Sequence, residues 1–397
     1  MLHAQIDMNT LEIESEDEGI HDDNEDDALT ETFNLPYTLG SEISVSVRRT
    51  YILHIDGNST NENVAVALSD QSCTIYDVSQ MKKLTSLQGH GGTISNIKFC
   101  PTDSHLVYSS SLDGTIKLWD TRLDNNIVKE FKDDSEGNDQ LKPLTDFDVS
   151  HNNRFISAGT ELINEDAFIL FWDVRSTNLL GGYWESHMDD ITQVKFHPEK
   201  QDILATGSTD GLINTFDISK SSEDDALLQS LNTESSVEKI HWFAHGDGDH
   251  SLSCITHTQD LQLWRLDGAA PYLRFDRESI SKSMQRKSSE DCFMVNVHTT
   301  KKPEEILLLT GATAGRGECL RTLSLHKKKL KPTSNFVGNK QIVRASWYNK
   351  NSEILITGGE SGIISLWRPK TGEENISIAE DLKMNAKQKA KHRKKPY

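Results

Sequence analysis

A set of chemically linked residues recurs at fixed spacing in this chain, and it is clearest between residues 89 and 120. A Gly89-His90 pair is followed by Ser109, by a tight-turn Asp113-Gly114 and by Leu118-Trp119-Asp120. Polar groups buried between strands need hydrogen-bond partners. We therefore expect a relay in which the indole meets the hydroxyl, the hydroxyl meets the imidazole, and the imidazole meets the carboxylate. Such a relay would hold one four-stranded sheet together.

Similar units follow one another along the chain when they are aligned on the end of their third strand. The second clear copy has His187, Thr206 and Asp210, with Phe216-Asp217 in place of Trp-Asp, so we expect it to lack the indole donor. The third-strand ends in order are Tyr76-Asp77, Trp119-Asp120, Trp172-Asp173, Phe216-Asp217, Trp264, Leu323 and Trp367. Short alternating runs separated by Gly, Asn, Asp and Ser lie between them, and no long run has helical spacing. The pattern predicts an all-β fold.

The seventh unit lacks a fourth strand, because the strand pattern ends after Trp367, at Pro369. Residues 43–47 alternate correctly to supply it, and closure by this N-terminal strand would leave no exposed sheet edge. We therefore predict a seven-bladed β-propeller over residues 41–370, between an acidic tail at 1–40 and a basic tail at 371–397. Deleting residues 41–48 is expected to destabilise the ring, and deleting residues 1–36 is not.

These units resemble WD-repeat propellers over residues 41–370. A closer likeness is to the WD repeat-containing protein 89 family. The stretches that carry it are Ala158-Gly159-Thr160-Glu161 with residues 168–173, residues 189–198, residues 206–217 and Glu223-Asp224-Asp225-Ala226-Leu227. Blade seven departs from the pattern, since Asn339 stands where His is usual and Ser361 where Asp is usual. We expect no relay in that blade.

Charge is unevenly spread along a chain of 397 residues whose net charge is −19. Residues 1–40 carry twelve Asp or Glu and no Lys or Arg, which is typical of a disordered tail. The propeller itself remains acidic, so nonspecific binding of nucleic acid by it is disfavoured. The five cysteines are scattered and form no metal-binding motif, as in a reducing compartment. No apolar run is long enough for a membrane span.

A WDxR pattern occurs in two consecutive units, as Asp120 with Arg122 and Asp173 with Arg175. The resemblance to propellers that serve cullin-4 ubiquitin ligases implies that such arginines project from the rim and bind the ligase adaptor. Arginine suits this role because its planar fork pairs bidentately and stacks on a partner. The alternative is that arginine is simply common at the end of this strand.

Carboxylates also gather in the loops that we expect on one face of the second to fourth units. This acidic crescent consists of Asp133, Asp134, Glu136, Asp139, Glu161, Glu165, Asp166, Asp189 and Asp190. On a rigid rim it would attract a Lys- or Arg-rich protein and raise its association rate. The alternative is a set of solubilising loops. Asp166 also fits the position of a turn aspartate, six residues before Trp172.

The C-terminal segment is a short basic cluster. Its members are Lys387, Lys389, Lys391, Arg393, Lys394 and Lys395. Such a cluster is typical of a nuclear or nucleolar localisation signal or of a tail that contacts RNA. Pairing with the acidic segments of the same chain is a further alternative. We expect a nuclear protein, with some in the cytoplasm.

Two fragments resemble parts of enzymes but lack the rest of the motif. Residues 311–317 are glycine-rich without the Lys-Ser/Thr of a phosphate loop, and residues 245–250 read as a loop better than as a metal site. We therefore expect a non-catalytic scaffold with no cofactor, no metal and no small-molecule substrate. Its partners would be proteins: a basic client such as a ribosomal or assembly protein, or, alternatively, the adaptor of a cullin-4 ligase for which this chain is the substrate receptor.

Overall fold

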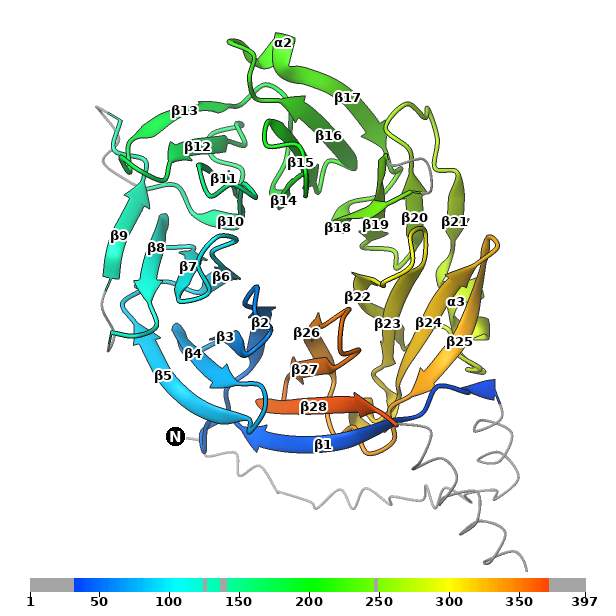
Figure 1. Ribbon diagram of the computed structural model, residues 1–397. Helices are drawn as coiled ribbons and strands as arrows, with labels where there is room; N and C mark the ends of the chain where they lie inside the picture. Colours follow the sequence, from blue (N-terminus) through cyan, green and yellow to red (C-terminus); the bar gives the residue numbers. More distant parts are fainter. Residues whose placement is uncertain (1–31, 124–126, 136–140, 246–248, 371–397) are drawn as a thin grey trace, which may run out of the picture.

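The computed structural model describes residues 32–123, 127–135, 141–245 and 249–370. Within them seven four-stranded antiparallel sheets are arranged as the blades of a ring, as Figure 1 shows. A cavity lined by residues of the innermost strands opens at the centre of the ring, and we call it the central channel. The predicted all-β, seven-bladed propeller is thus confirmed.

The strands follow one another from the inside of each blade to the outside. Blade one consists of β2 (Ile52–Gly57), β3 (Asn63–Leu68), β4 (Ser72–Asp77) and β5 (Lys82–Gln88); blade two of β6 (Ile94–Phe99), β7 (Leu106–Ser111), β8 (Thr115–Asp120) and β9 (Ile127–Lys132); blade three of β10 (Leu144–Val149), β11 (Phe155–Thr160), β12 (Ile169–Asp173) and β13 (Leu179–Tyr183); blade four of β14 (Ile191–Phe196), β15 (Ile203–Ser208), β16 (Leu212–Asp217) and β17 (Leu227–Asn232). Blade five consists of β18 (Val237–Ala244), β19 (His250–Thr256), β20 (Leu261–Trp264) and β21 (Leu273–Phe275); blade six of β22 (Cys292–Thr299), β23 (Ile306–Ala312), β24 (Leu320–His326) and β25 (Lys329–Asn335); blade seven of β26 (Val343–Tyr348), β27 (Leu355–Gly359), β28 (Ile363–Pro369) and β1 (Tyr37–Ser44).

Because neighbouring strands are antiparallel, the turns of each blade alternate between two faces of the ring. We call the face with the blade-to-blade connections and the second-to-third strand turns the top face. The face with the other two kinds of turn is the bottom face. The third strands are mostly buried, β8 along its whole length, whereas the outer strand β9 is mostly exposed.

The ring is closed by β1, which pairs antiparallel with β28 from Tyr37 opposite Pro369 to Ser44 opposite Ile363. Closure by an N-terminal strand was predicted, but the strand lies at residues 37–44 and not at 43–47. Val47 is fully exposed, with a relative exposure of 106%. The ordered ring also begins before the predicted boundary at residue 41, since Phe33 is buried.

Adjacent blades pack through the contact between one blade's second strand and the next blade's first strand. Gly159 and Gly358 mark this contact. A Cβ at Gly159 would lie 2.4 Å from Cγ2 of Ile191, and one at Gly358 would lie 2.6 Å from Cγ2 of Ile52. Glycine therefore lets β14 approach β11, and lets blade one approach blade seven where the ring closes.

Two short α-helices lie between the strands of the described residues, and the sequence analysis found neither. One is α2 (Glu223–Ala226) and the other is α3 (Arg277–Ser283), which lies between blades five and six. The side chain of Asp276 caps α3 by accepting a hydrogen bond from the Ser279 N–H at 2.7 Å. Ile280 and Met284, one turn apart, are buried beside blade six. Two apolar positions are too few to give a helical period in the sequence.

Among the described residues, no helix is both long enough and apolar enough to cross a bilayer.

Candidate functional site

The relay of blade two joins the four residues that the sequence placed together. Nε2 of His90 lies 2.8 Å from Oγ of Ser109, and its Nδ1 lies 2.9 Å from Oδ2 of Asp113. The indole N–H of Trp119 donates to the same Ser109 oxygen at 2.8 Å. Burial alone would raise the pKa of Asp113, but hydrogen bonds from His90, Thr115 and the Gly91 N–H outweigh it and lower that pKa.

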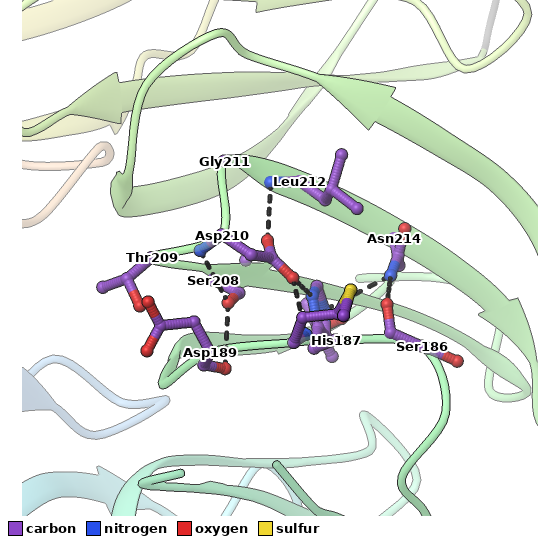
Figure 2. Close-up of polar contacts among 12 residues, drawn as sticks. Ser186, His187, Asp189, Ser208, Thr209, Asp210, Gly211, Leu212 and Asn214 are labelled. Atoms are coloured by element: carbon purple, nitrogen blue, oxygen red, sulfur yellow. Dashed lines mark hydrogen bonds and ion pairs between the residues drawn. The ribbon is translucent and has the colours of Figure 1, made fainter. Parts of the chain in front are cut away.

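Blade four repeats this arrangement without the indole, as Figure 2 shows. His187 contacts Oγ1 of Thr206 at 2.7 Å and Oδ2 of Asp210 at 2.9 Å. The other oxygen of Asp210 accepts from the Leu212 N–H at 2.8 Å, which fixes the turn between β15 and β16. Nδ2 of Asn214 donates to the carbonyl of Ser186 at 2.6 Å and holds the preceding connection. Both relays are buried inside their blades, and this favours a structural role over catalysis.

The other buried indoles show what happens where the relay hydroxyl is missing. In blade three, Ala158 occupies the position of Ser109, and the Trp172 N–H donates to the backbone carbonyl of Lys132 at 3.0 Å. In blade five, the Trp264 N–H donates to Oε1 of Gln262 at 3.1 Å. A hydroxyl is therefore one of several ways to satisfy this indole.

Blade seven keeps the indole bond but not the histidine. The Trp367 N–H donates to Oγ1 of Thr357 at 3.0 Å. Gln341 donates to the Ile363 carbonyl at 2.6 Å and accepts from the Ser361 N–H at 3.2 Å. A glutamine thus fixes the turn that His and Asp fix in blades two and four. The departure seen at Asn339 and Ser361 in the sequence is explained by this exchange.

Ser109→Ala should destabilise the whole ring. The substitution removes the hydroxyl that contacts both the Trp119 indole and the His90 imidazole. Each of these two buried groups then lacks its hydrogen-bond partner. We expect a loss of about 1–3 kcal/mol in the free energy of unfolding. Urea denaturation followed by tryptophan fluorescence measures it. Ser109→Thr is the matched control, since the Thr206 hydroxyl contacts the relay histidine in blade four. An alanine variant as stable as this control would contradict the prediction.

The two WDxR arginines lie at the bottom face, each folded back on the aspartate of its own motif. Arg122 binds Asp120 through Nε at 2.9 Å and through Nη2 at 2.6 Å. Arg175 binds Asp173 in the same way, at 2.9 and 2.5 Å. The hydrogen bonds from Arg122 lower the pKa of Asp120 to about 2. The arginine side chains remain 58% and 72% exposed.

Lys129 joins the two motifs. Its Nζ donates to the carbonyl of Val174 at 2.6 Å and to that of Arg175 at 3.2 Å, so β9 of blade two is tied to the turn after β12 of blade three. The two exposed guanidinium groups are therefore displayed from neighbouring blades that are fixed to each other.

The acidic crescent lies on the top face around blade three, but one of its members is not available to a partner. Asp133 is buried, with a relative exposure of 4%, and it forms an ion pair with Lys142 and a hydrogen bond with Ser135. The charge of Asp133 already holds the connection between blades two and three, so we leave Asp133 out of the surface that we propose for a basic client. Glu136 and Asp139 lie outside the described residues.

The six other members of the crescent are Asp134, Glu161, Glu165, Asp166, Asp189 and Asp190. None of them forms an ion pair within the described ranges. The backbone of Asp166 forms a β-bridge with that of Ile163 in the connection between β11 and β12. Asp166 is therefore also a turn residue, which was the alternative interpretation. Oδ1 of Asp190 accepts from the Leu162 N–H at 2.7 Å and ties this turn to the connection between blades three and four.

Exposed apolar side chains accompany these carboxylates, and the sequence analysis missed them. Leu162 is 41% exposed beside Asp190, and Met188 is 82% exposed beside Asp189. Leu112 is 37% exposed in the corresponding turn of blade two. An apolar residue inside an otherwise polar turn was the available signal. Apolar and acidic groups together are typical of a surface that binds a protein.

The central channel is a second feature that sequence reasoning missed. A β-bulge lies at the same place in all seven innermost strands, so two rings of residues occupy equivalent positions around the centre of the propeller. The upper ring is His54, Asn96, Asp146, Gln193, Lys239, Asn296 and Ala345. The lower ring is Asp56, Lys98, Asp148, Lys195, His241, His298 and Trp347.

The lysines of the channel differ in whether they form ion pairs. Lys98 pairs with Asp148, and Lys195 pairs with Asp146 at 2.8 Å, so blades two to four are neutralised. Lys239 in blade five has no ion pair among the residues that the structure places, and its Nζ donates to the carbonyl of Val295 at 2.5 Å. Burial lowers the pKa of Lys239. Within the described segments, no group of three His, Cys, Asp or Glu is placed to hold a metal ion.

The WD domain, G-beta repeat family model matches residues 81–120 and 180–217. These segments contain the first three strands of blades two and four, the two blades that carry the histidine relay. This chain is a seven-bladed β-propeller with WD repeats at these two places. Propellers of this family are typically interaction scaffolds that bind other proteins.

Relatives of this WD-repeat propeller cover most of its length. It is 28% identical to the WD repeat-containing protein GTS1 of Arabidopsis thaliana over 70% of this chain and 69% of that protein. It is 25% identical to the WD repeat-containing protein 89 homolog of Dictyostelium discoideum, over 83% of this chain and 85% of that protein. An uncharacterized WD repeat-containing protein of Schizosaccharomyces pombe is also 25% identical, over 83% and 99%. The resemblance drawn from the sequence is confirmed.

Proposed function

We propose that this propeller is a non-catalytic nuclear scaffold whose top face around blade three holds a basic client protein. The single observation that carries the proposal is the set of six crescent carboxylates without an ion pair among the described residues. A carboxylate that is left unpaired beside exposed Leu162 and Met188 favours a partner that brings Lys or Arg together with apolar contact.

The backbone of this face is fixed, and this supports a binding role over that of a loose solubilising loop. The Thr209 N–H donates to the carbonyl of Asp190 at 3.0 Å, and Oγ of Ser208 donates to the carbonyl of Asp189 at 3.1 Å. The connection after blade three is therefore held on the relay turn of blade four. A preformed surface loses less conformational entropy when it binds.

Replacing Asp166 and Asp189 by lysine should weaken the binding of a 15-residue peptide of alternating Lys and Arg by at least tenfold. The two substitutions turn attraction into repulsion on the crescent, while Asp190 keeps its hydrogen bond to Leu162. Fluorescence anisotropy of the labelled peptide measures the affinity. The control variant is Asp224→Lys with Asp267→Lys, which has the same net charge at exposed sites away from the crescent. If both variants weakened binding equally, the effect would come from the net charge of the protein and not from the crescent, and the proposal would be contradicted.

A second candidate function is supported by the paired arginines of blades two and three. We propose it as the alternative: a substrate receptor that binds the adaptor of a cullin-4 ligase through Arg122 and Arg175. Both side chains are exposed, are preorganised by their own aspartates and come from blades tied together by Lys129. An exposed arginine whose conformation is already fixed by its own aspartate loses little entropy when a partner binds its remaining N–H groups or stacks on its plane.

The double variant Arg122→Ala with Arg175→Ala should abolish recovery of the cullin-4 adaptor in affinity purification and leave the fold intact. Both arginines are at the surface, so a small change in stability is expected. Arg48→Ala with Arg316→Ala removes the same charge from exposed positions elsewhere and serves as the control. Undiminished recovery with the first variant would exclude this function.

The proposed nuclear location depends on the C-terminal basic cluster. Residues 387–395 lie outside the described residues, so localisation signal and RNA contact both stay predictions for that segment.

A further inference from the structure

Three cavities follow one another across the bottom face, from the channel to the outer edge of blades five and six. The first, of about 560 Å³, is that of the central channel and is lined by Lys98, Lys195 and Trp347 among others. It shares Trp242, Thr299 and Lys350 with the second, of about 310 Å³. The second shares residues 302–305 with the third, of about 780 Å³. Together they form one continuous groove, which we call the radial groove.

The radial groove is basic, although the protein as a whole carries a net charge of −19. Eight Lys or Arg side chains line it, against four carboxylates. Two of the eight, Lys98 and Lys195, are already neutralised by Asp148 and Asp146, so the free positive charge lies toward blades five to seven. One of the four carboxyls that line the groove, Asp56, has its pKa raised to about 6 by burial. Lys327, Lys328 and Lys350 have no ion pair in the part of the chain that the structure describes. At 0.1 M salt a charge acts over about 10 Å, so a ligand in the groove feels these lysines more than the distant acidic face.

Aromatic rings line the same groove and are held in place. Trp347 lies against the backbone of Gly57, where a Cβ would come within 2.1 Å of its indole. The Trp242 N–H donates to the carbonyl of Lys195 at 3.1 Å, and its ring lies 4.9 Å from that of His197. Trp347 and Tyr348 are partly exposed to the cavity. Fixed, partly exposed rings offer faces on which flat groups stack.

One buried atom in the groove also has no partner. Nε2 of His241 is buried and makes no hydrogen bond within the described residues, although His241 lines the channel end of the groove. Buried polar atoms in native proteins are nearly always satisfied. A ligand that enters the channel mouth would supply the missing hydrogen bond.

We propose that the radial groove binds single-stranded nucleic acid, with phosphates on the lysines of blades six and seven and bases against Trp347 and Tyr348. Spaced cations beside aromatic faces are the combination that such ligands need. An acidic peptide would use the cations but not the rings. A duplex would hide its bases. This site is independent of the acidic crescent, which lies on the opposite face.

The first test uses the full chain and a fluorescein-labelled 15-nucleotide uridine RNA in anisotropy titrations at several salt concentrations. Lys301→Glu, Lys327→Glu and Lys328→Glu together should weaken binding at least tenfold and reduce the slope of log affinity against log salt by about 2. All three lysines are exposed, so folding should be unaffected. The control triple Lys82→Glu, Lys83→Glu and Lys282→Glu has the same net charge and should bind within about threefold of the parent. Equal loss with both triples would overturn the proposal.

The second test locates the contact, because the basic C-terminal segment could also bind RNA. A 4-thiouridine oligonucleotide is crosslinked to the full chain, and the modified peptides are identified by mass spectrometry. We expect crosslinks in the peptide that contains Trp347-Tyr348. Crosslinks confined to residues 371–397 would overturn the proposal. So would a 15-residue polyglutamate peptide that competes as well as the RNA, since the groove would then be a site for acidic peptides.

Discussion

Removal of residues 37–44 will destabilise the entire ring and broaden its unfolding transition. These residues form β1, the outer strand of blade seven, and pair with β28 along its whole length. Without them β28 becomes an exposed edge, and Tyr37, Leu39 and Ile43 no longer pack on blade seven and its neighbours. We expect a loss of roughly 3–6 kcal/mol, from about 1.5–3 kcal/mol for each fully buried large apolar side chain and less for these half-buried ones. Thermal and urea denaturation followed by circular dichroism measure it.

Two further deletions serve as controls for this result. Removal of residues 1–31 should leave the midpoint unchanged. Removal of residues 1–36 should cost a measurable part of the stability, since Phe33 is buried under the guanidinium of Arg321 and the Leu35 N–H donates to the Thr333 carbonyl at 2.9 Å. This replaces the expectation that residues 1–36 are dispensable. A chain without residues 37–44 that melts like the parent would show that closure contributes little.

The second large effect is a loss of stability between pH 7 and pH 5, caused by histidines of the channel. Burial lowers the pKa of His54, His241 and His298 to about 3 each, and nearby lysines lower it further in the same direction. In the unfolded chain the pKa is about 6.5. The unfolded state therefore binds more protons over this range, so stability is fully present above about pH 6.5 and is lost as the pH falls. Each histidine contributes roughly 2 kcal/mol between pH 6.5 and 5.

Carboxyl groups in the channel oppose part of this loss. Burial raises the pKa of Asp56 to about 6, and it also raises the pKa of Asp146. Both carboxyl groups therefore bind protons more tightly in the folded state, and a fall in pH stabilises the fold through them. The three histidines outweigh them. The relay carboxyls Asp113 and Asp210 act in a different window: their pKa values are lowered in the fold, so their contribution is lost only below about pH 4.

Urea midpoints at pH 7, 6 and 5 test this prediction. The variant with His54→Gln, His241→Gln and His298→Gln cannot titrate at these positions, and its midpoint should change much less over the same range. A parent protein with equal midpoints at pH 7 and pH 5 would contradict the assignment of neutral, desolvated histidines to the channel.

The sequence predicted the features that depend on short spacing and local chemistry. His90, Ser109 and Asp113 lie within one blade, so their offsets alone define the relay. The missing outer strand of blade seven follows from the end of the pattern at Pro369. The exact closing strand did not follow, because Tyr37–Ser44 contains Gly40 and a bulge between Leu39 and Ser41, which break the strict alternation that marked residues 43–47.

The features that the sequence did not predict depend on contacts between segments far apart in the chain. Asp133 looked like its exposed neighbours, and only its pairing with Lys142 shows that it is buried. The channel rings require the register of seven bulged strands, and the radial groove requires turns from blades four to seven to meet on one face. Neither arrangement leaves a period or a motif along the chain.

The pairing of β1 with β28 also has a consequence for how the molecule is made. β1 is synthesised first among the ordered strands, but its partner is synthesised last. During translation this segment has no native neighbour on β28 until nearly every other blade has been built. Such a long-range contact carries a high entropic cost and forms slowly. We therefore expect completion of the ring to be the late step of folding, and nascent chains to keep an unpaired edge that chaperones can recognise.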